Sequence, residues 1–217
     1  MNLFVIGDVH GCYETFLKML THWDKEQEVL IQLGDLIDRG NKSPEVVKLA
    51  RQLKRKYPYQ AVFLKGNHEY EIIEHIVHPP NHNWLKQGGI ETLDQYVQIG
   101  RDIKDDVNWF HTMPLFWENE TVFVSHAGIS RLSSNPFNEM DVSGILWNRG
   151  PLKNIQKLQV IGHTPHDSPI YEAKSNSWNI DTAAVFGNYL TGMKIKQNGE
   201  ILEWVKVKTD KGDRKGL

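Results

Sequence analysis

The chain has 217 residues, of which 40% are hydrophobic and 24% are charged, and its formal net charge is −2. These values are typical of a single soluble globular domain, and they argue against the basic face that a nucleic-acid-binding protein needs. No apolar run is long enough to cross a bilayer, and the start of the chain lacks the basic segment of a signal peptide. The only cysteine is Cys12, so no internal disulfide can form, and we expect a protein of the reducing cytoplasm.

Three strand–turn–helix units follow one another from the start of the chain. Short apolar runs predict strands over residues 3–6, 29–33 and 61–64. Helical spacing of apolar residues predicts helices over residues 12–23, 43–56 and 70–77. Ser43 as an N-cap, followed by Pro44, marks the start of the second helix. Three such units in a row indicate a parallel sheet, in which functional residues gather at the carboxyl ends of the strands.

The second half of the chain is richer in strands. Residues 81–112 have helical spacing with polar interruptions, and we expect a further polar helical segment after the HAG motif at 126–128. Strands are expected over residues 115–117, 122–125, 158–161, 170–173, 178–180, 189–195 and 201–207. The Asn-Gly pair at 198–199 predicts a hairpin between the last two. We expect one domain over residues 1–209 and a polar, frayed tail over residues 210–217.

Charged, imidazole and amide side chains follow the predicted strands within a few positions. They are Asp8, His10, Asp35, Asp38, Arg39, Asn67, His68, His126 and His163. Charge at the end of a buried strand is costly unless a partner or a metal compensates it. Carboxylate and imidazole ligands without a thiolate suit manganese, iron or zinc. Because one carboxylate can be shared by two ions, we predict a two-metal site in which Asp35 is shared.

Five motifs carry a resemblance to a known family. In this order, GDVHG, GDLIDRG, GNHE, HAG and GHTP resemble the metallophosphoesterases of the serine/threonine phosphoprotein phosphatase type, in particular the small bacterial and phage lambda-phosphatase-like enzymes. The resemblance covers most of the chain. It implies a calcineurin-like α/β fold with two mixed β-sheets packed as a sandwich and flanked by helices. It also implies a phosphoric ester hydrolase in which a hydroxide that bridges two metals attacks the phosphate in line.

The resemblance further implies which residues bind the metals. Asp35 would bridge both ions, and Asp8 and His10 would complete the first site. Three residues would complete the second site: Asn67, His126 and His163. We expect manganese, with iron, zinc or nickel as alternatives, because metal availability often outweighs intrinsic affinity.

The same resemblance assigns the remaining site residues. His68 would protonate the leaving alkoxide, and Asp38 would orient His68. Arg39 and Arg149 would hold the phosphoryl oxygens, to which guanidinium groups bind in a bidentate manner. Ala183 departs from the pattern, because related enzymes usually carry glycine after the Asp-Thr pair. We expect this change to affect loop packing more than metal binding.

The expected substrate is a phosphorylated protein or peptide, or a small phosphate ester. The alternative is a symmetrical diadenosine tetraphosphate hydrolase that releases ADP from the same metal site, with residues 81–112 deciding between the two. No docking groove for a regulatory subunit is expected in so short a chain. An inactive binding scaffold is disfavoured because every ligand position is filled. A phosphodiesterase or nuclease is disfavoured because Pro165 follows GHT where a second histidine is common.

Three further features have two interpretations each. Cys12 at a helix N-terminus is either a reactive thiol or, as we favour, a packing residue. His75, His78 and His82 suggest a second metal site, but Pro79-Pro80 interrupts their spacing and favours a solvated helix end and loop. Trp84 with Gly88-Gly89 is either a wall of the substrate site or part of the core.

Overall fold

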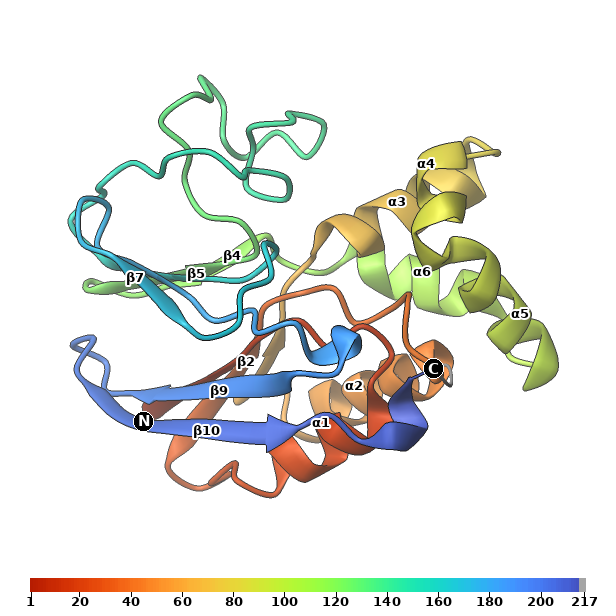
Figure 1. Cartoon of the computed structure of the whole chain (residues 1–217), viewed down its shortest axis with the longest axis horizontal. Coiled ribbons are helices and arrows are strands. Elements are labelled where there is room, and N and C mark those ends of the chain that lie inside the picture. Colours follow the sequence, from red (N-terminus) through yellow and green to blue (C-terminus); the bar gives the residue numbers. More distant parts are fainter. Residues whose placement is uncertain (215–217) are drawn as a thin grey trace.

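Two mixed β-sheets of five strands each stack face to face in the computed structural model, which describes residues 1–214 (Figure 1). The sandwich predicted from the sequence is therefore confirmed. The strands of the first sheet lie in the order β10 (Ile201–Lys208), β9 (Tyr189–Ile195), β1 (Asn2–Ile6), β2 (Glu28–Gln32) and β3 (Ala61–Phe63). β1, β2 and β3 are parallel, as the three strand–turn–helix units predict, and β9 and β10 add an antiparallel hairpin beside β1.

The second sheet also contains three parallel strands. Its order is β4 (Phe116–Glu118), β5 (Val122–Ser125), β6 (Leu158–Ile161), β8 (Ser177–Asn179) and β7 (Ile170–Glu172). β5, β6 and β8 are parallel, whereas β4 and β7 pair in antiparallel fashion at the two edges. Because the carboxyl ends of parallel strands open at one edge of a sheet, each sheet presents three loops at such an edge.

The helices form two groups. α1 (Tyr13–Leu20) and α2 (Ser43–Lys56) connect the parallel strands of the first sheet and cover its outer face, in the lower part of Figure 1. The second group contains α3 (Asn67–Val77), α4 (His82–Trp84), a π-helical turn η1 (Leu85–Gly89), α5 (Ile90–Gln98) and α6 (Ile103–His111). The helical content predicted for residues 81–112 is confirmed. Of the helices in the described part of the chain, not one combines the length and the hydropathy needed to cross a membrane.

The connection between β5 and β6, residues 126–157, consists of turns and irregular loops. The helix expected after the HAG motif is therefore wrong: the described residues form no helix between these two strands. Short polar side chains take the backbone N–H groups that a helix would need. Asn135 N–H donates to the hydroxyl of Ser133, and Ser143 N–H donates to the carboxylate of Asp141. Such local bonds compete with the helical ladder.

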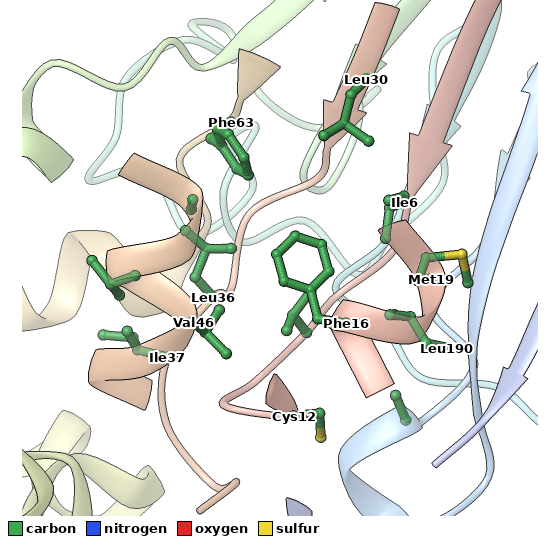
Figure 2. Packing of buried hydrophobic residues seen from close by; sticks show 14 of the residues in the cluster. Ile6, Cys12, Phe16, Met19, Leu30, Leu36, Ile37, Val46, Phe63 and Leu190 are labelled. Carbon is green, nitrogen blue, oxygen red and sulfur yellow. The ribbon is translucent and has the colours of Figure 1, made fainter. Parts of the chain in front are cut away.

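Both faces of the first sheet are buried, which is why its central strands are almost continuously apolar. On β1, Leu3 and Val5 face the second sheet, whereas Phe4 and Ile6 face the helices. Phe16 of α1 lies in the middle of the cluster on the helix side (Figure 2). Because side chains alternate along a strand, those of β1 pack into two separate hydrophobic clusters, one on each face of the sheet.

Cys12 belongs to the cluster on the helix side and has no exposed surface (Figure 2). Burial, helped by the nearby Asp213 carboxylate, raises the pKa of the Cys12 thiol to about 12. A thiol that stays protonated is a poor nucleophile. The packing role predicted for Cys12 is therefore confirmed.

Residues 210–214 pack onto α1, so the frayed tail expected from the sequence is wrong for this part. The buried Asp213 carboxylate accepts hydrogen bonds from the backbone N–H groups of Glu14 and Thr15, at 2.9 and 2.8 Å. It also accepts a bond of 2.6 Å from the Thr15 hydroxyl. Because the first N–H groups of a helix have no partner within it, Asp213 caps α1 from the far end of the chain. Residues 215–217 lie outside the described residues, and the predicted domain boundary stays a prediction.

Candidate metal centre

Six strand ends, three from each sheet, meet at one edge of the sandwich. The loops after β1 and β2 carry Asp8, His10, Asp35, Asp38 and Arg39, and the start of α3, which follows β3, carries Asn67 and His68. The loops after β5, β6 and β8 carry His126, His163 and Asp181. All of these side chains except that of Arg39 are buried. The structure brings them into contact across long stretches of sequence: the backbone N–H of His163 bonds to Asp8, 155 residues away.

The Asp35 carboxylate lies at the centre of this group. Its Oδ2 is 3.4 Å from Nε2 of His10 and 3.5 Å from Nε2 of His126. Nε2 of His68 is 4.0 Å from the same oxygen. Burial acts to raise the pKa of Asp35, but the surrounding imidazoles, led by His126 and His68, hold it below its usual value. An ionised carboxylate among several imidazole nitrogens can be shared by two cations.

Two clusters of side chains have ligand atoms close enough to hold one metal ion each. The clusters are His10, Asp35 and His68, and Asp35, His126 and His163. Within each cluster the ligand atoms lie within 4.8 Å of one another. Asn67 adjoins the second cluster, because its Oδ1 is 3.0 Å from Nε2 of His126 and 2.9 Å from Nδ1 of His163. The two clusters fit a binuclear metal centre.

Backbone carbonyls hold the imidazole nitrogens that point away from the clusters. Nδ1 of His10 donates to the carbonyl of Ile37 at 2.8 Å, and Nδ1 of His126 donates to that of Leu33 at 2.9 Å. These bonds select the tautomer that leaves the lone pair of Nε2 facing the cluster. Burial lowers the pKa of both imidazoles and that of His163. Neutral imidazole is the form that binds metal.

Asp8 contributes a carboxylate oxygen that has no protein partner. Its Oδ2 accepts the backbone N–H of His163 at 3.1 Å, whereas its buried Oδ1 accepts no hydrogen bond. A Cβ at Gly162 would overlap this oxygen, so only glycine leaves room for it. Burial, together with the Asp181 and Asp35 carboxylates, raises the pKa of Asp8. An orphaned oxygen among buried carboxylates is costly unless a cation compensates it, so this donor set fits metal ions.

Asp181 is a site residue that the motifs do not identify. It is buried after β8, and burial, with the Asp35 charge adding to it, raises the pKa of Asp181 to about 6. Its carboxylate accepts the backbone N–H of Ala183 at 3.0 Å. Asp181 comes two residues after the end of β8, just as Asp8 comes two residues after the end of β1, and this position after a predicted strand is the sequence signal that could have identified it.

The loops that carry the ligands are held in strained conformations. φ is +46° at His10 and +54° at Asp35, in a region that residues other than glycine rarely adopt. The Glu69 carboxylate stabilises the Asp35 loop by accepting backbone N–H groups of Asp35, Leu36 and Gly66, each at 2.8 Å. The buried side chain of Glu69 therefore fixes the turn from which the shared carboxylate projects.

A buried histidine–carboxylate pair lies beside the clusters. Nδ1 of His68 is 2.6 Å from Oδ2 of Asp38, and neither side chain has exposed surface. Burial acts to lower the pKa of His68, but the carboxylates of Asp35 and Asp38 raise it above its usual value. The Arg39 guanidinium lies 2.6 Å from Nε2 of His10 and 2.8 Å from Nε2 of His68. A candidate proton donor, His68, and a permanently charged side chain, Arg39, thus lie next to the two clusters.

Arg149 lies at the rim of the site and outside both clusters. It is exposed, and its Nη1 is 3.3 Å from the hydroxyl of Thr164, the residue after His163. Its charge still contributes to the lowered pKa of His126 and of His163. Arg149 is therefore near enough to act on an anion at the rim.

The histidines of the 75–82 segment lie outside both clusters of the described residues. Nδ1 of His75 accepts the backbone N–H of Asn81, and its ring packs 4.9 Å from that of Trp84. His78 pairs with Glu74 on an exposed helix end. These contacts agree with the solvated helix end and loop favoured from the sequence.

Comparisons with known proteins show which proteins this chain is similar to. Residues 1–196 match the family of calcineurin-like phosphoesterases. The chain is 28% identical over 213 residues to serine/threonine-protein phosphatase 1 of Salmonella typhimurium, with 90% of this chain and 92% of that protein covered. It is 27% identical over 232 residues to the asymmetrical bis(5'-nucleosyl)-tetraphosphatase PrpE of Oceanobacillus iheyensis, with 91% and 90% covered. A solved serine/threonine phosphatase of Saccharomyces cerevisiae shares the fold, with a TM-score of 0.70, 18% identity, and 97% of this chain and 81% of that chain covered.

Replacing the shared carboxylate tests the metal centre. We expect Asp35→Ala to lose both ions, because the two clusters then lack the carboxylate that they share and the ligands that remain carry less negative charge. Elemental analysis of protein loaded with manganese should fall from about two ions per chain to nearly none. The control is Asp94→Ala, an exposed position of α5, which should bind as the wild type does. Full occupancy of both positions in Asp35→Ala would contradict a shared ligand.

Ala183 allows a test of loop strain. Its φ of +58° and ψ of +41° place it in the left-handed region, which suits the glycine that related enzymes carry. We expect Ala183→Gly to raise the free energy of unfolding by about 0.5–1 kcal/mol in urea denaturation. Ala184→Gly is the control: Ala184 is buried in the following 3₁₀ turn, so this change should lower stability. A loss of stability in Ala183→Gly would show that the strain relieved is smaller than the entropy that glycine adds to the unfolded chain.

Proposed function

Because the chain belongs to the calcineurin-like phosphoesterase family and is a metal-dependent phosphoesterase, we propose that it hydrolyses phosphate monoesters, with phosphoserine and phosphothreonine peptides as its main substrate class. The observation that carries this proposal is the Asp35 carboxylate, which belongs to both metal clusters and lies beside the buried His68–Asp38 pair. With two cations bound, such a site would combine their charge with a proton donor, which suits the hydrolysis of a phosphate ester.

We assign six residues to two divalent cations, with Asp35 shared between them. Asp8 and His10 complete one site, and Asn67, His126 and His163 complete the other. When bound, the ions would supply charge neutralisation for the phosphoryl group and an activated water. The orphaned oxygen of Asp8 supports its assignment to the first ion. Carboxylate, amide and imidazole donors suit manganese, with iron, zinc and nickel as alternatives.

His68 has two conceivable roles, because an imidazole bonded to a carboxylate can bind a metal or donate a proton. We assign it the proton-donor role. Nε2 of His68 is farther from Oδ2 of Asp35 than Nε2 of His10 is, at 4.0 Å against 3.4 Å, and Asp8 already offers the first ion a free oxygen. With Nδ1–H donated to Asp38, a proton on Nε2 would be the one available to the leaving oxygen of the ester. Nε2 can carry that proton once the Arg39 guanidinium, which lies 2.8 Å from Nε2 and can only donate, has turned to the substrate phosphate.

The two arginines are proposed to bind the substrate phosphate. Arg39 lies within hydrogen-bond distance of His68 and His10, so its guanidinium is next to the position of the leaving group. Arg149 would approach from the rim, since it adjoins Thr164. Guanidinium groups match the geometry of phosphoryl oxygens and keep their charge at any working pH.

The buried thiol of Cys12 and the lack of a second cysteine support a cytoplasmic location.

The Salmonella relative, a serine/threonine-protein phosphatase by name, supports the peptide substrate class. A second candidate is hydrolysis of dinucleoside tetraphosphates, which the name of the Oceanobacillus relative supports at nearly the same identity. Both reactions could use the same clusters, so they differ in what holds the substrate beyond the reacting phosphate. Within this second candidate, a symmetrical cut of diadenosine tetraphosphate yields two ADP, whereas an asymmetrical cut yields ATP and AMP.

Removing the proposed acid separates its role from that of a metal ligand. We expect His68→Ala to keep both ions and to lose about 10²–10⁴-fold in kcat on alkyl phosphates, with a smaller loss on p-nitrophenyl phosphate, whose leaving group needs no proton. Kinetics and elemental analysis of the same preparation provide the measurement. His111→Ala, on the exposed end of α6, should behave as the wild type. Loss of one ion in His68→Ala would assign His68 to the metal instead, and equal losses on both esters would rule out its role as the acid.

A substrate comparison tests the proposed class. The manganese-loaded protein is incubated with a phosphothreonine peptide and with diadenosine tetraphosphate, and kcat/KM is measured for each. We expect the peptide to be the better substrate. A much higher kcat/KM for the dinucleotide would reverse the ranking, and chromatography of the nucleotide products would then identify the bond that is cut.

A further inference from the structure

The Asp38 carboxylate is fully buried and accepts hydrogen bonds from three side chains. Its Oδ2 lies 2.6 Å from Nδ1 of His68 and accepts the indole N–H of Trp84 at 2.7 Å. Its Oδ1 accepts the hydroxyl of Thr92 at 2.6 Å. Trp84 and Thr92 belong to none of the five motifs. They come from the helical segment between β3 and β4, where Trp84 ends α4 and Thr92 lies in α5.

These bonds leave the Asp38 side chain a single orientation. The indole N–H can only donate and an ionised carboxylate can only accept, so the direction of the Trp84 bond is settled. The backbone N–H of Asp38 is also fixed, because it donates to the hydroxyl of Ser43 at 2.9 Å. Rotation of the carboxylate would break the bond to Thr92 or the bond to Trp84. The imidazole of His68, tied to the same oxygen as Trp84, cannot turn without losing its partner.

The segment that carries Trp84 is shaped to press against the Asp38 loop. A Cβ at Gly88, where φ is +113°, would come within 2.7 Å of the backbone nitrogen of Arg39. A Cβ at Gly89 would come within 2.5 Å of the Trp84 ring. The two glycines therefore permit the close approach that brings the indole N–H to Asp38. Trp84 has no exposed surface, so it cannot form a wall of the substrate site, and the core interpretation of this residue is the one that agrees with its burial.

We propose that Trp84 and Thr92 are positioning residues, which hold the Asp38 carboxylate and through it keep the His68 imidazole aimed at the metal centre. This inference rests on the proposed function, in which His68 protonates the leaving oxygen. Among the described residues, neither side chain hydrogen-bonds to a side chain of the two clusters. Both bond to Asp38, and Thr92 also lies 3.4 Å from the Ser43 hydroxyl that accepts the backbone N–H of Asp38, so their effect on the reaction passes through the Asp38 side chain and its loop. Their removal should therefore weaken proton donation and leave metal binding intact. Residues that orient a catalytic imidazole from behind commonly affect activity by about 10–100-fold.

The test uses a series of aryl phosphates, from phenyl to p-nitrophenyl, with the full-length manganese-loaded protein. Thr92→Val removes the hydroxyl at nearly constant volume, and Trp84→Phe removes the N–H while keeping an aromatic ring. We expect each variant to lose about tenfold in kcat on phenyl phosphate and less than about threefold on p-nitrophenyl phosphate, since one hydrogen bond to a charged group is involved. KM and metal content should stay at the wild-type values. Thr92→Ser, which restores the hydroxyl, should recover most of the loss.

A second arm places Thr92→Val in the His68→Ala background. The additional loss on phenyl phosphate should vanish there, because no imidazole remains to be positioned. Equal losses on both esters, or a full additional loss in the double variant, would show a general structural role and overturn the inference. If Trp84→Phe fails to fold, the Thr92 variants decide alone. A wild-type protein that hydrolyses the aryl phosphates but no phosphothreonine peptide would end the proposed substrate class and leave this inference standing.

Discussion

The electrostatic balance around the Asp35 carboxylate is the constraint on which the rest of the structure depends. This carboxylate is only 2% exposed, and three imidazole nitrogens lie within 4.0 Å of one of its oxygens. A buried charge of this kind is tolerated only where opposite charge or strong donors compensate it. Because Nδ1 of His10 and of His126 donates to a backbone carbonyl, their Nε2 atoms present lone pairs, and the compensating charge would come from the cations that the two clusters fit. Because His10 follows β1 and His126 follows β5, the two sheets have to stack with these strand ends together. The site can therefore form only when the two sheets pack in this arrangement.

Rigid support for the ligands comes from groups that do not themselves face the clusters. The Glu69 carboxylate accepts hydrogen bonds from the backbone N–H groups of Asp35, Leu36 and Gly66. Backbone carbonyls accept hydrogen bonds from the rings of His10 and His126 and so fix their orientation. The left-handed backbone at Asp35 is maintained by these bonds, since an isolated turn of the same sequence would relax. Ligands held this firmly need little reorganisation when cations or a substrate arrive.

The helical segment between β3 and β4 contributes two buried side chains to the support of the site. That residues 81–112 distinguish substrates stays a prediction. In the structure, Trp84 and Thr92 of this segment are buried beneath the site and bonded to Asp38. The segment therefore supports the reacting groups from within the core.

The sequence by itself determined the parallel order of the first three strands and the set of polar residues at the strand ends, because these follow from local periodicity. The two mixed sheets were expected from the resemblance that the five short motifs carry. Prediction from the sequence failed for residues 126–157, where Ser, Asn and Asp side chains bind the backbone locally, and for the tail, where Asp213 caps a helix at the other end of the chain. Only the tertiary structure placed Asp181 beside Asp8, and Trp84 beneath Asp38. Those contacts join residues that no short pattern connects, and their energy arises from burial, which a linear sequence does not specify.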